Sequence, residues 1–186
     1  MPRIEPLSPP YGPELERLLV RMTGTDEVEP LKLFRTLAVH EEITSRMRPL
    51  GGALLAHPTI EPRDREIVIH RMTARCGAEY EWGVHAVAFG RPLGLDDAQL
   101  AATVHGDAGD PAWSEHDRLL IELVDELDET ATVSDGLWNR LAAEWSPSQL
   151  VELVVLAGWY RLISQVINAC GVEHEDWGER FPPAPG

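Results

Sequence analysis

Cysteines and basic side chains are scarce in this sequence of 186 residues, and each scarcity excludes a class of protein. The two cysteines, Cys76 and Cys170, are too few for a disulfide framework, and we expect both to be buried free thiols. Only 16 lysines and arginines stand against 31 aspartates and glutamates, which gives a net charge of −15. Because nucleic acids and anionic lipids are bound through basic side chains, we expect neither nucleic acid nor membrane as a partner.

Long apolar runs and familiar catalytic motifs are missing as well. The N-terminal residues contain no apolar run of signal-peptide length, and polar side chains interrupt the most apolar window, residues 150–170. We therefore expect a cytoplasmic protein. The sequence contains no Gly-rich phosphate loop, no His-x-x-x-His or Cys-x-x-Cys pair and no Gly-x-Ser-x-Gly motif, and we expect neither a bound cofactor nor a metal site.

The negative charge is concentrated in the second half of the chain. Residues 1–93 contain 13 acidic and 12 basic side chains, whereas residues 94–186 contain 18 acidic and 4 basic ones. We expect this excess acid to form the outer, solubilising face of an oligomer. The acidic run from Glu115 to Glu129 is expected to be a solvated helix face.

Helix-boundary signals recur along the chain, and no stretch alternates apolar and polar residues between hairpin turns. The sequence therefore predicts an all-α fold in a single domain. Capping residues Asp96, Ser114, Ser134 and Ser146 predict helices over residues 96–105, 114–129, 135–145 and 147–171. Proline and glycine positions predict earlier helices over 13–23, 30–37, 62–76 and 78–90, and Pro49 predicts a kinked or divided helix over 40–56.

The chain is expected to divide into three parts. Residues 1–29 form an N-terminal extension with a short helix, residues 30–172 form the helical domain, and residues 173–186 form a tail. The tail from Phe181 onward is expected to be disordered or to lie extended over a neighbour. Helix 147–170 has one narrow polar stripe, formed by Arg161, Gln165 and Asn168, and we expect it to be buried on most sides, within the fold or at a subunit contact.

The candidate chemistry lies on two neighbouring helices. Glu81 and His85 are four residues apart and therefore share one helix face, while Glu66 lies on the preceding helix, which the turn at Gly77 folds back beside them. A carboxylate beside an imidazole is a plausible proton relay, because it fixes the tautomer and raises the basicity of the ring. A surface or structural ion pair remains the alternative, and a metal site formed by these three residues has too few ligands.

Five segments resemble the carboxymuconolactone decarboxylase family, a superfamily that also includes the thiol enzymes of the alkylhydroperoxidase D type. The resemblance covers residues 30–172 in order and with matching spacing, and it implies an all-α fold assembled as a trimer or hexamer. The segments that carry it are Pro30–Leu37 (PLKLFRTL), Leu50–Leu55 (LGGALL), Pro62–Ile69 (PRDREIVI), Glu79–His85 (EYEWGVH) and Gln149–Tyr160 (QLVELVVLAGWY).

The hydroperoxidase branch is matched only in part. Its Glu and its final His fall on Glu66 and His85, but its two redox cysteines fall on Ala78 and Glu81, and the His between them falls on Tyr80. Peroxide reduction needs a thiolate and a resolving thiol, so the resemblance implies no activity of that kind. Cys76 is two residues upstream of the first thiol position and has no resolving cysteine nearby.

The decarboxylase branch resembles the chain better, through Glu81-Trp82-x-x-His85. The resemblance implies catalysis by His85 as general acid, with Glu66 or Glu81 orienting it, because the enolate-like carbon left by CO₂ needs a proton. Cations for a carboxylate substrate are expected from the arginines near the turn. The assigned substrate contacts are Tyr80, Trp82, Arg65 and Arg71, with Arg63 and Arg75 as further nearby cations.

The sequence therefore favours a cofactor-free homo-oligomer that acts on a small carboxylated or lactone metabolite by His/Glu acid–base chemistry. Two alternatives stay open. The first is a peroxide-reducing enzyme that uses Cys76, and the second is a non-catalytic ligand-binding or scaffold member of the same superfamily.

Overall fold

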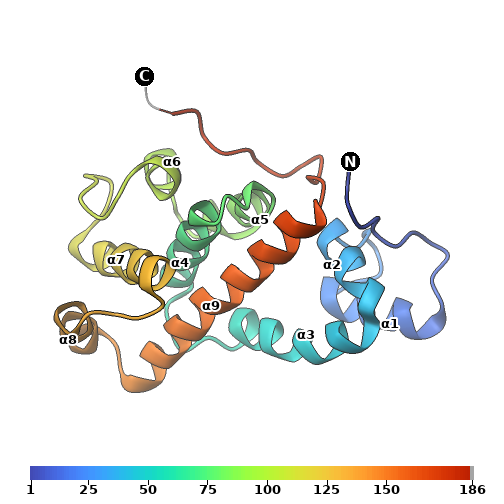
Figure 1. The fold of residues 1–186 in the computed structure, drawn as a ribbon, viewed down its shortest axis with the longest axis horizontal. Coiled ribbons are helices and arrows are strands. Elements are labelled where there is room, and N and C mark those ends of the chain that lie inside the picture. Colours follow the sequence, from blue (N-terminus) through green and yellow to red (C-terminus); the bar gives the residue numbers. More distant parts are fainter. Residues whose placement is uncertain (185–186) are drawn as a thin grey trace.

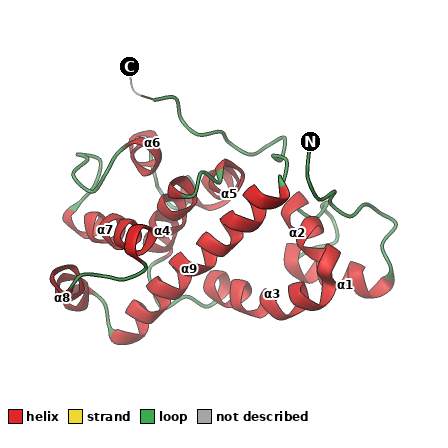
Figure 2. Ribbon diagram, in the orientation of Figure 1, coloured by secondary structure: helices red, strands yellow, loops and turns green. Residues whose placement is uncertain are grey.

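The computed structural model describes residues 1–184 and is built of helices, with no strand among those residues (Figures 1 and 2). The prediction of an all-α fold is therefore confirmed. The elements are α1 (Pro13–Thr23), α2 (Lys32–Leu37), the 3-10 turn η1 (Ala38–His40), α3 (Glu41–Ala56), α4 (Pro62–Arg75), α5 (Glu79–His85), the π-helical turn η2 (Ala86–Gly90), α6 (Asp97–His105), α7 (Glu115–Thr130), α8 (Asp135–Glu144) and α9 (Pro147–Cys170).

The predicted capping residues begin the helices of the second half. Asp96, Ser114 and Ser146 each form a reciprocal capping box with the residue three positions later, and Ser134 accepts a hydrogen bond from the backbone N–H of Leu137. Gly171 ends α9 with a φ of 68°, in the left-handed region that favours glycine. These local signals placed the boundaries within one or two residues.

One helix settles between two predicted forms and another differs from the prediction. α3 continues through Pro49 and is not divided, because an interior proline removes a single backbone hydrogen bond and the turns on both sides remain helical. The helix that begins at Glu79 leaves the α-helical pattern at Ala86, and the N–H of Arg91 bonds to the carbonyl of Ala86 across five residues. Gly90 closes this wider turn directly against the ring of His70.

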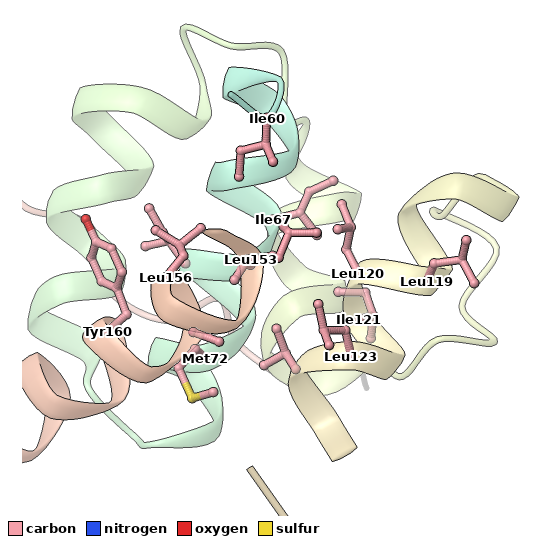
Figure 3. Packing of buried hydrophobic residues seen from close by; sticks show 14 of the residues in the cluster. Ile60, Ile67, Met72, Leu119, Leu120, Ile121, Leu123, Leu153, Leu156 and Tyr160 are labelled. Carbon is pink, nitrogen blue, oxygen red and sulfur yellow. The ribbon is translucent and has the colours of Figure 1, made fainter. Parts of the chain in front are cut away.

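The core forms around α4, which packs against α5, α6, α7 and α9. Figure 3 shows the side chains of α4, α7 and α9 converging, with the Tyr160 ring at the edge of the cluster and its hydroxyl directed away from it. α9 is long and apolar enough to cross a membrane by length and composition alone, a test that core helices of soluble proteins also pass. One face of α9 lies in the core, while its other face exposes Val151, Val155 and Leu162.

The acidic helix α7 is paired with arginines along its inner edge. Arg63, Arg71 and Arg75 of α4 lie 2.6, 2.7 and 3.1 Å from Asp117, Asp125 and Asp128, and we call these three pairs the α4–α7 ladder. The expectation of a solvated α7 face is therefore wrong for this edge. The arginines of the near-neutral half neutralise part of the acid of the other half.

The C-terminal tail lies over its own chain. After α9 it runs past α5 (Figure 1), where the backbone N–H of Phe181 donates to Glu79 and its ring meets Trp82 edge to face. The tail is therefore ordered against α5 rather than disordered or laid over a neighbour. Residues 185–186 of the predicted tail lie outside the described residues.

Candidate functional site

The α4–α5 turn brings Glu66 and His85 into direct contact, as the sequence predicts. Gly77 has a φ of 63°, which reverses the chain between the two helices. The His85 Nδ1 then lies 2.9 Å from the Glu66 Oε2, and both side chains are buried. A third predicted residue joins them, because the Glu81 Oε1 lies 3.6 Å from the His85 Nε2.

Burial alone would neutralise both members of this pair, but their mutual attraction keeps both of them charged. Burial raises the pKa of Glu66, yet the charge and hydrogen bond of His85 outweigh it and hold that pKa below its ordinary value of 4.5. Burial lowers the pKa of His85, but Glu66 and then Glu81 raise it to about 9. At neutral pH the site therefore contains a glutamate anion and a protonated imidazole.

The His85 Nε2 faces the hydroxyl of Tyr160 as well as Glu81. The Tyr160 Oη lies 3.2 Å from this nitrogen, and its ring meets the imidazole at right angles. Burial raises the pKa of Tyr160 well above its usual range, so the phenol keeps its own hydrogen. Because the protonated imidazole donates to the Tyr160 oxygen, the phenol hydrogen stays available for another acceptor.

Arg65 holds the Glu66 carboxylate, and His70 holds the backbone of the same residue. The Arg65 Nε donates to the Glu66 Oε1 at 3.0 Å, and the Arg65 Nη1 also donates to the carbonyl of Leu55. His70 is completely buried, and its Nδ1 lies 2.7 Å from the Glu66 carbonyl. Burial lowers the pKa of His70 to about 4, so this second imidazole is neutral. His70 therefore lies behind the Glu66–His85 pair as a neutral hydrogen-bonding side chain.

His85, Glu81 and Tyr160 line a cavity of about 540 Å³. Its wall is mostly apolar, and Figure 1 shows the helices that form it, with α1, α2 and α3 on one side and α5 and α9 on the other. Glu81 is 7% exposed, and its buried Oε2 has no hydrogen-bond partner in the described chain. An unpaired buried carboxylate oxygen on a cavity wall is a place where a ligand can donate a hydrogen bond.

The four assigned substrate contacts lie elsewhere, since none of them lines the cavity in the described chain. The Tyr80 hydroxyl donates to Glu175 of the tail, and the Trp82 Nε1 donates to the Thr103 hydroxyl within the core. Arg65 forms an ion pair with Glu66, and Arg71 forms one with Asp125. Their hydrogen bonds make them structural and positioning residues.

The cavity also contains residues that sequence reasoning missed. Tyr160 lies within the segment 149–160 used for the resemblance, but α9 is far from His85 in the sequence and no local spacing connects them. Phe89 packs on the imidazole with ring centroids 5.0 Å apart, because the π-helical turn carries it there. Arg21 and Arg48 line the opposite side of the cavity.

The cysteines lie outside this cavity. Both are half-buried rather than buried, so that expectation is wrong. The Cys76 Sγ lies 3.9 Å from the Met72 Sδ, and burial together with Asp128 raises the pKa of the thiol. A raised pKa disfavours the thiolate that attacks a peroxide. Within residues 1–184, no group of three His, Cys, Asp or Glu residues is arranged to hold a metal ion.

The sequence matches no protein-family model and no curated protein. The fold, however, is shared with solved structures. A peroxidase-related protein from Silicibacter sp. TM1040 superposes with a TM-score of 0.77 at 13% identity, over 95% of this chain and 93% of that chain. The debrominase Bmp8, as a cysteine-to-alanine variant in complex with 2,3,4-tribromopyrrole, gives a TM-score of 0.73 at 13% identity, over 94% and 92%.

A third solved structure shares the fold and indicates its type. It is a protein of unknown function from Agrobacterium tumefaciens whose description suggests an antioxidant defence protein of the AhpD kind. It superposes with a TM-score of 0.68 at 18% identity, over 75% of this chain and 95% of that chain. This chain therefore has the alkylhydroperoxidase D-like helical fold. At such identities the likeness concerns the fold alone.

Proposed function

Starting from this alkylhydroperoxidase D-like fold, we propose that the protein is a thiol-independent enzyme that acts on a small carboxylated or lactone metabolite by acid–base chemistry, in the manner of a carboxymuconolactone decarboxylase. One observation carries the proposal: the imidazole of His85 is held between Glu66 and Tyr160 on the wall of a cavity. A buried acid on the wall of a cavity, within reach of a ligand, is in the position of a general acid.

In the proposed reaction, each residue of the site has a role in the loss of CO₂. The bond between the carboxylate and the adjacent carbon breaks, CO₂ leaves, and the electron pair stays on the substrate as an enolate. His85 then gives its Nε2 proton to the carbon, and the neutral imidazole is reprotonated from water. The phenol hydrogen of Tyr160 is placed to bond the enolate oxygen. Glu66 keeps the ring oriented and charged.

The two alternative functions have less support from the site. Peroxide reduction would depend on Cys76, which lies outside the cavity and has a raised pKa. A scaffold without chemistry would not need a charged pair buried at a cavity wall, because an apolar pair of the same shape would stabilise the fold at least as well. Both alternatives can be distinguished from acid–base chemistry by experiment.

The test is turnover of a panel of muconolactone-like acids and β-keto acids in D₂O, followed by CO₂ release and by deuterium incorporation into the product. We expect His85→Ala to reduce kcat by about 10²-fold or more, the usual contribution of a general acid. Tyr160→Phe should reduce kcat and leave KM nearly unchanged. The matched control is His57→Ala, because His57 is an exposed histidine outside the cavity.

Unchanged turnover in His85→Ala would contradict the proposal. So would a wild-type protein that turns over no member of the panel but loses Cys76 reactivity toward a thiol reagent at substoichiometric peroxide.

A further inference from the structure

The end of the cavity formed by α1 and α3 has the features of a recognition site for an anion. We propose that Arg48, together with Arg21 and the hydroxyl of Thr23, binds the carboxylate of an acid with an apolar body, which lies along the cavity toward His85. The carboxylate held there stays on the product and is separate from the reacting group. The chemistry at His85 rests on the proposed function, whereas the anion site rests on the following observations.

The first observation is the pairing of the arginines. In a chain with a net charge of −15, acidic partners are abundant, and the arginines of the α4–α7 ladder all have them. Among residues 1–184, Arg3, Arg17, Arg21, Arg48 and Arg118 have no carboxylate within 4.0 Å, and of these Arg21 and Arg48 line the cavity. The arginines of the described chain that form such pairs are Arg35, Arg46, Arg63, Arg65, Arg71, Arg75, Arg91, Arg140, Arg161 and Arg180.

The surroundings of Arg48 leave its charge available. The Arg48 side chain makes one hydrogen bond in the described chain, from its Nη1 to the backbone carbonyl of Arg21 at 3.4 Å. Glu29 is the acidic residue on this side of the cavity, and Arg35 already pairs with it at 3.0 Å. A partly buried guanidinium without a counter-ion gains most from a carboxylate, which it can bind through two parallel hydrogen bonds.

Thr23 adds a second donor on the same wall. Its Oγ1 is buried and has no hydrogen-bond partner in the described chain, although the residue lines the cavity. A buried hydroxyl without a partner costs free energy, which a carboxylate oxygen of a ligand would recover. Two guanidinium groups and one free hydroxyl together match an anion.

The opposite end of the cavity sets the orientation of the ligand. Glu81 lies there with an unpaired buried oxygen, which a hydrogen-bond donor on the far end of the ligand would satisfy. Between the two ends the walls are apolar, and a cavity of about 540 Å³ is in the range that encloses a drug-sized ligand. The apolar wall is formed by Leu33, Phe34, Leu37, Met47, Trp159 and Ile163.

The experiment measures binding and does not depend on turnover. The probes are 4-phenylbutyrate and octanoate, each with its matched neutral alcohol, followed by calorimetry and by tryptophan fluorescence, since Trp159 and Trp177 line the cavity. Wild-type protein should bind each carboxylate at least about tenfold more tightly than the alcohol. Arg48→Gln should remove about tenfold of the carboxylate affinity and leave the affinity for the alcohol unchanged, and Arg48→Lys should retain part of the preference.

The control is Arg46→Gln, which removes the same charge from the same helix at an exposed position outside the cavity. It should bind both probes as the wild type does. The inference is overturned if Arg48→Gln binds the carboxylates as tightly as wild type, if the alcohols bind equally well, or if neither carboxylate binds. His85→Ala should retain carboxylate binding, so a failure of the proposed acid–base chemistry would leave this result intact.

Discussion

Because the Glu66–His85 pair is buried, the free energy of unfolding depends on the protonation states of these two residues. The pair lies at the centre of a layered cluster, with Arg65 and His70 behind Glu66 and with Tyr160 in front of His85. A charged pair in such a place is stable only while both partners keep their charges. The site therefore responds to pH through folding as well as through chemistry.

Stability should decrease on the alkaline side of neutrality. The pKa of His85 is raised from 6.5 to about 9, so its contribution is complete below pH 6.5 and disappears as pH rises through about 9. The full shift corresponds to roughly 3 kcal/mol of unfolding free energy. Urea denaturation of the wild type between pH 6 and pH 10 should show this loss, and His85→Gln should give a much flatter profile over the same range.

The two halves of the site differ in how far the sequence could predict them. Glu81 and His85 share a helix face by spacing alone, and Gly77 allows Glu66 to fold beside them. Tyr160 and Arg48 come from helices distant in sequence, and their positions depend on packing that no local periodicity encodes. The pairing of Arg71 was not predictable for the same reason, because its partner Asp125 lies on another helix.

At the scale of elements, α5 and the tail form one unit. A Cβ on Gly83 would lie 1.9 Å from the carbonyl oxygen of Glu179, so the helix and the tail touch through backbone. The Glu179 N–H also donates to the Gly83 carbonyl, at 3.3 Å. This contact holds the segment that carries Trp177 against the cavity.

Gly83→Ala should therefore detach the tail. Because the atom in conflict belongs to backbone, the clash is relieved by movement of the tail, and we expect a loss of roughly 1–3 kcal/mol of unfolding free energy. Hydrogen exchange at residues 174–182 should become faster. Gly136→Ala is the control: it meets nothing within 4 Å in α8 and should stabilise the protein by roughly 0.5–1 kcal/mol. Equal changes in unfolding free energy and in hydrogen exchange for the two variants would show that Gly83 does not hold the tail.

The helix boundaries could be predicted from local sequence signals, whereas the ordered position of the tail could not. Capping boxes and prolines act over three or four residues, which a single sequence displays. The order in the tail comes from partners about a hundred residues away, such as Glu79 for Phe181, and its proline-rich composition gave no sign of them. The π-helical turn was likewise not predicted, and the residue that Gly90 meets there, His70, lies on another helix.

At the scale of the whole molecule, the charge imbalance is partly resolved inside the chain. The arginines of the first half and the aspartates of the second meet in the α4–α7 ladder. Arg71 is the buried member, and it also donates to the carbonyls of Thr103 and Gly106. The two halves of the sequence are therefore joined by charge as well as by the apolar core.

The ion pairs of the α4–α7 ladder should differ sharply in their contributions to the free energy of unfolding. Arg71→Ala leaves Asp125 and two carbonyls without their donor, and we expect it to cost roughly 3–5 kcal/mol of unfolding free energy. The side chain of Arg75 is 31% exposed, so Arg75→Ala should cost less than about 1 kcal/mol. Urea denaturation of both variants measures the difference. Similar losses would show that burial does not set the value of these pairs.

The ladder also bears on the behaviour of the protein at high temperature. The hydration of charged groups becomes less favourable on heating, so the cost of removing Arg71 and Asp125 from water decreases as the temperature rises. Apolar burial gives no comparable gain over the same range. Near the melting temperature, the pairs between α4 and α7 therefore supply a larger share of the remaining stability than they do in the cold.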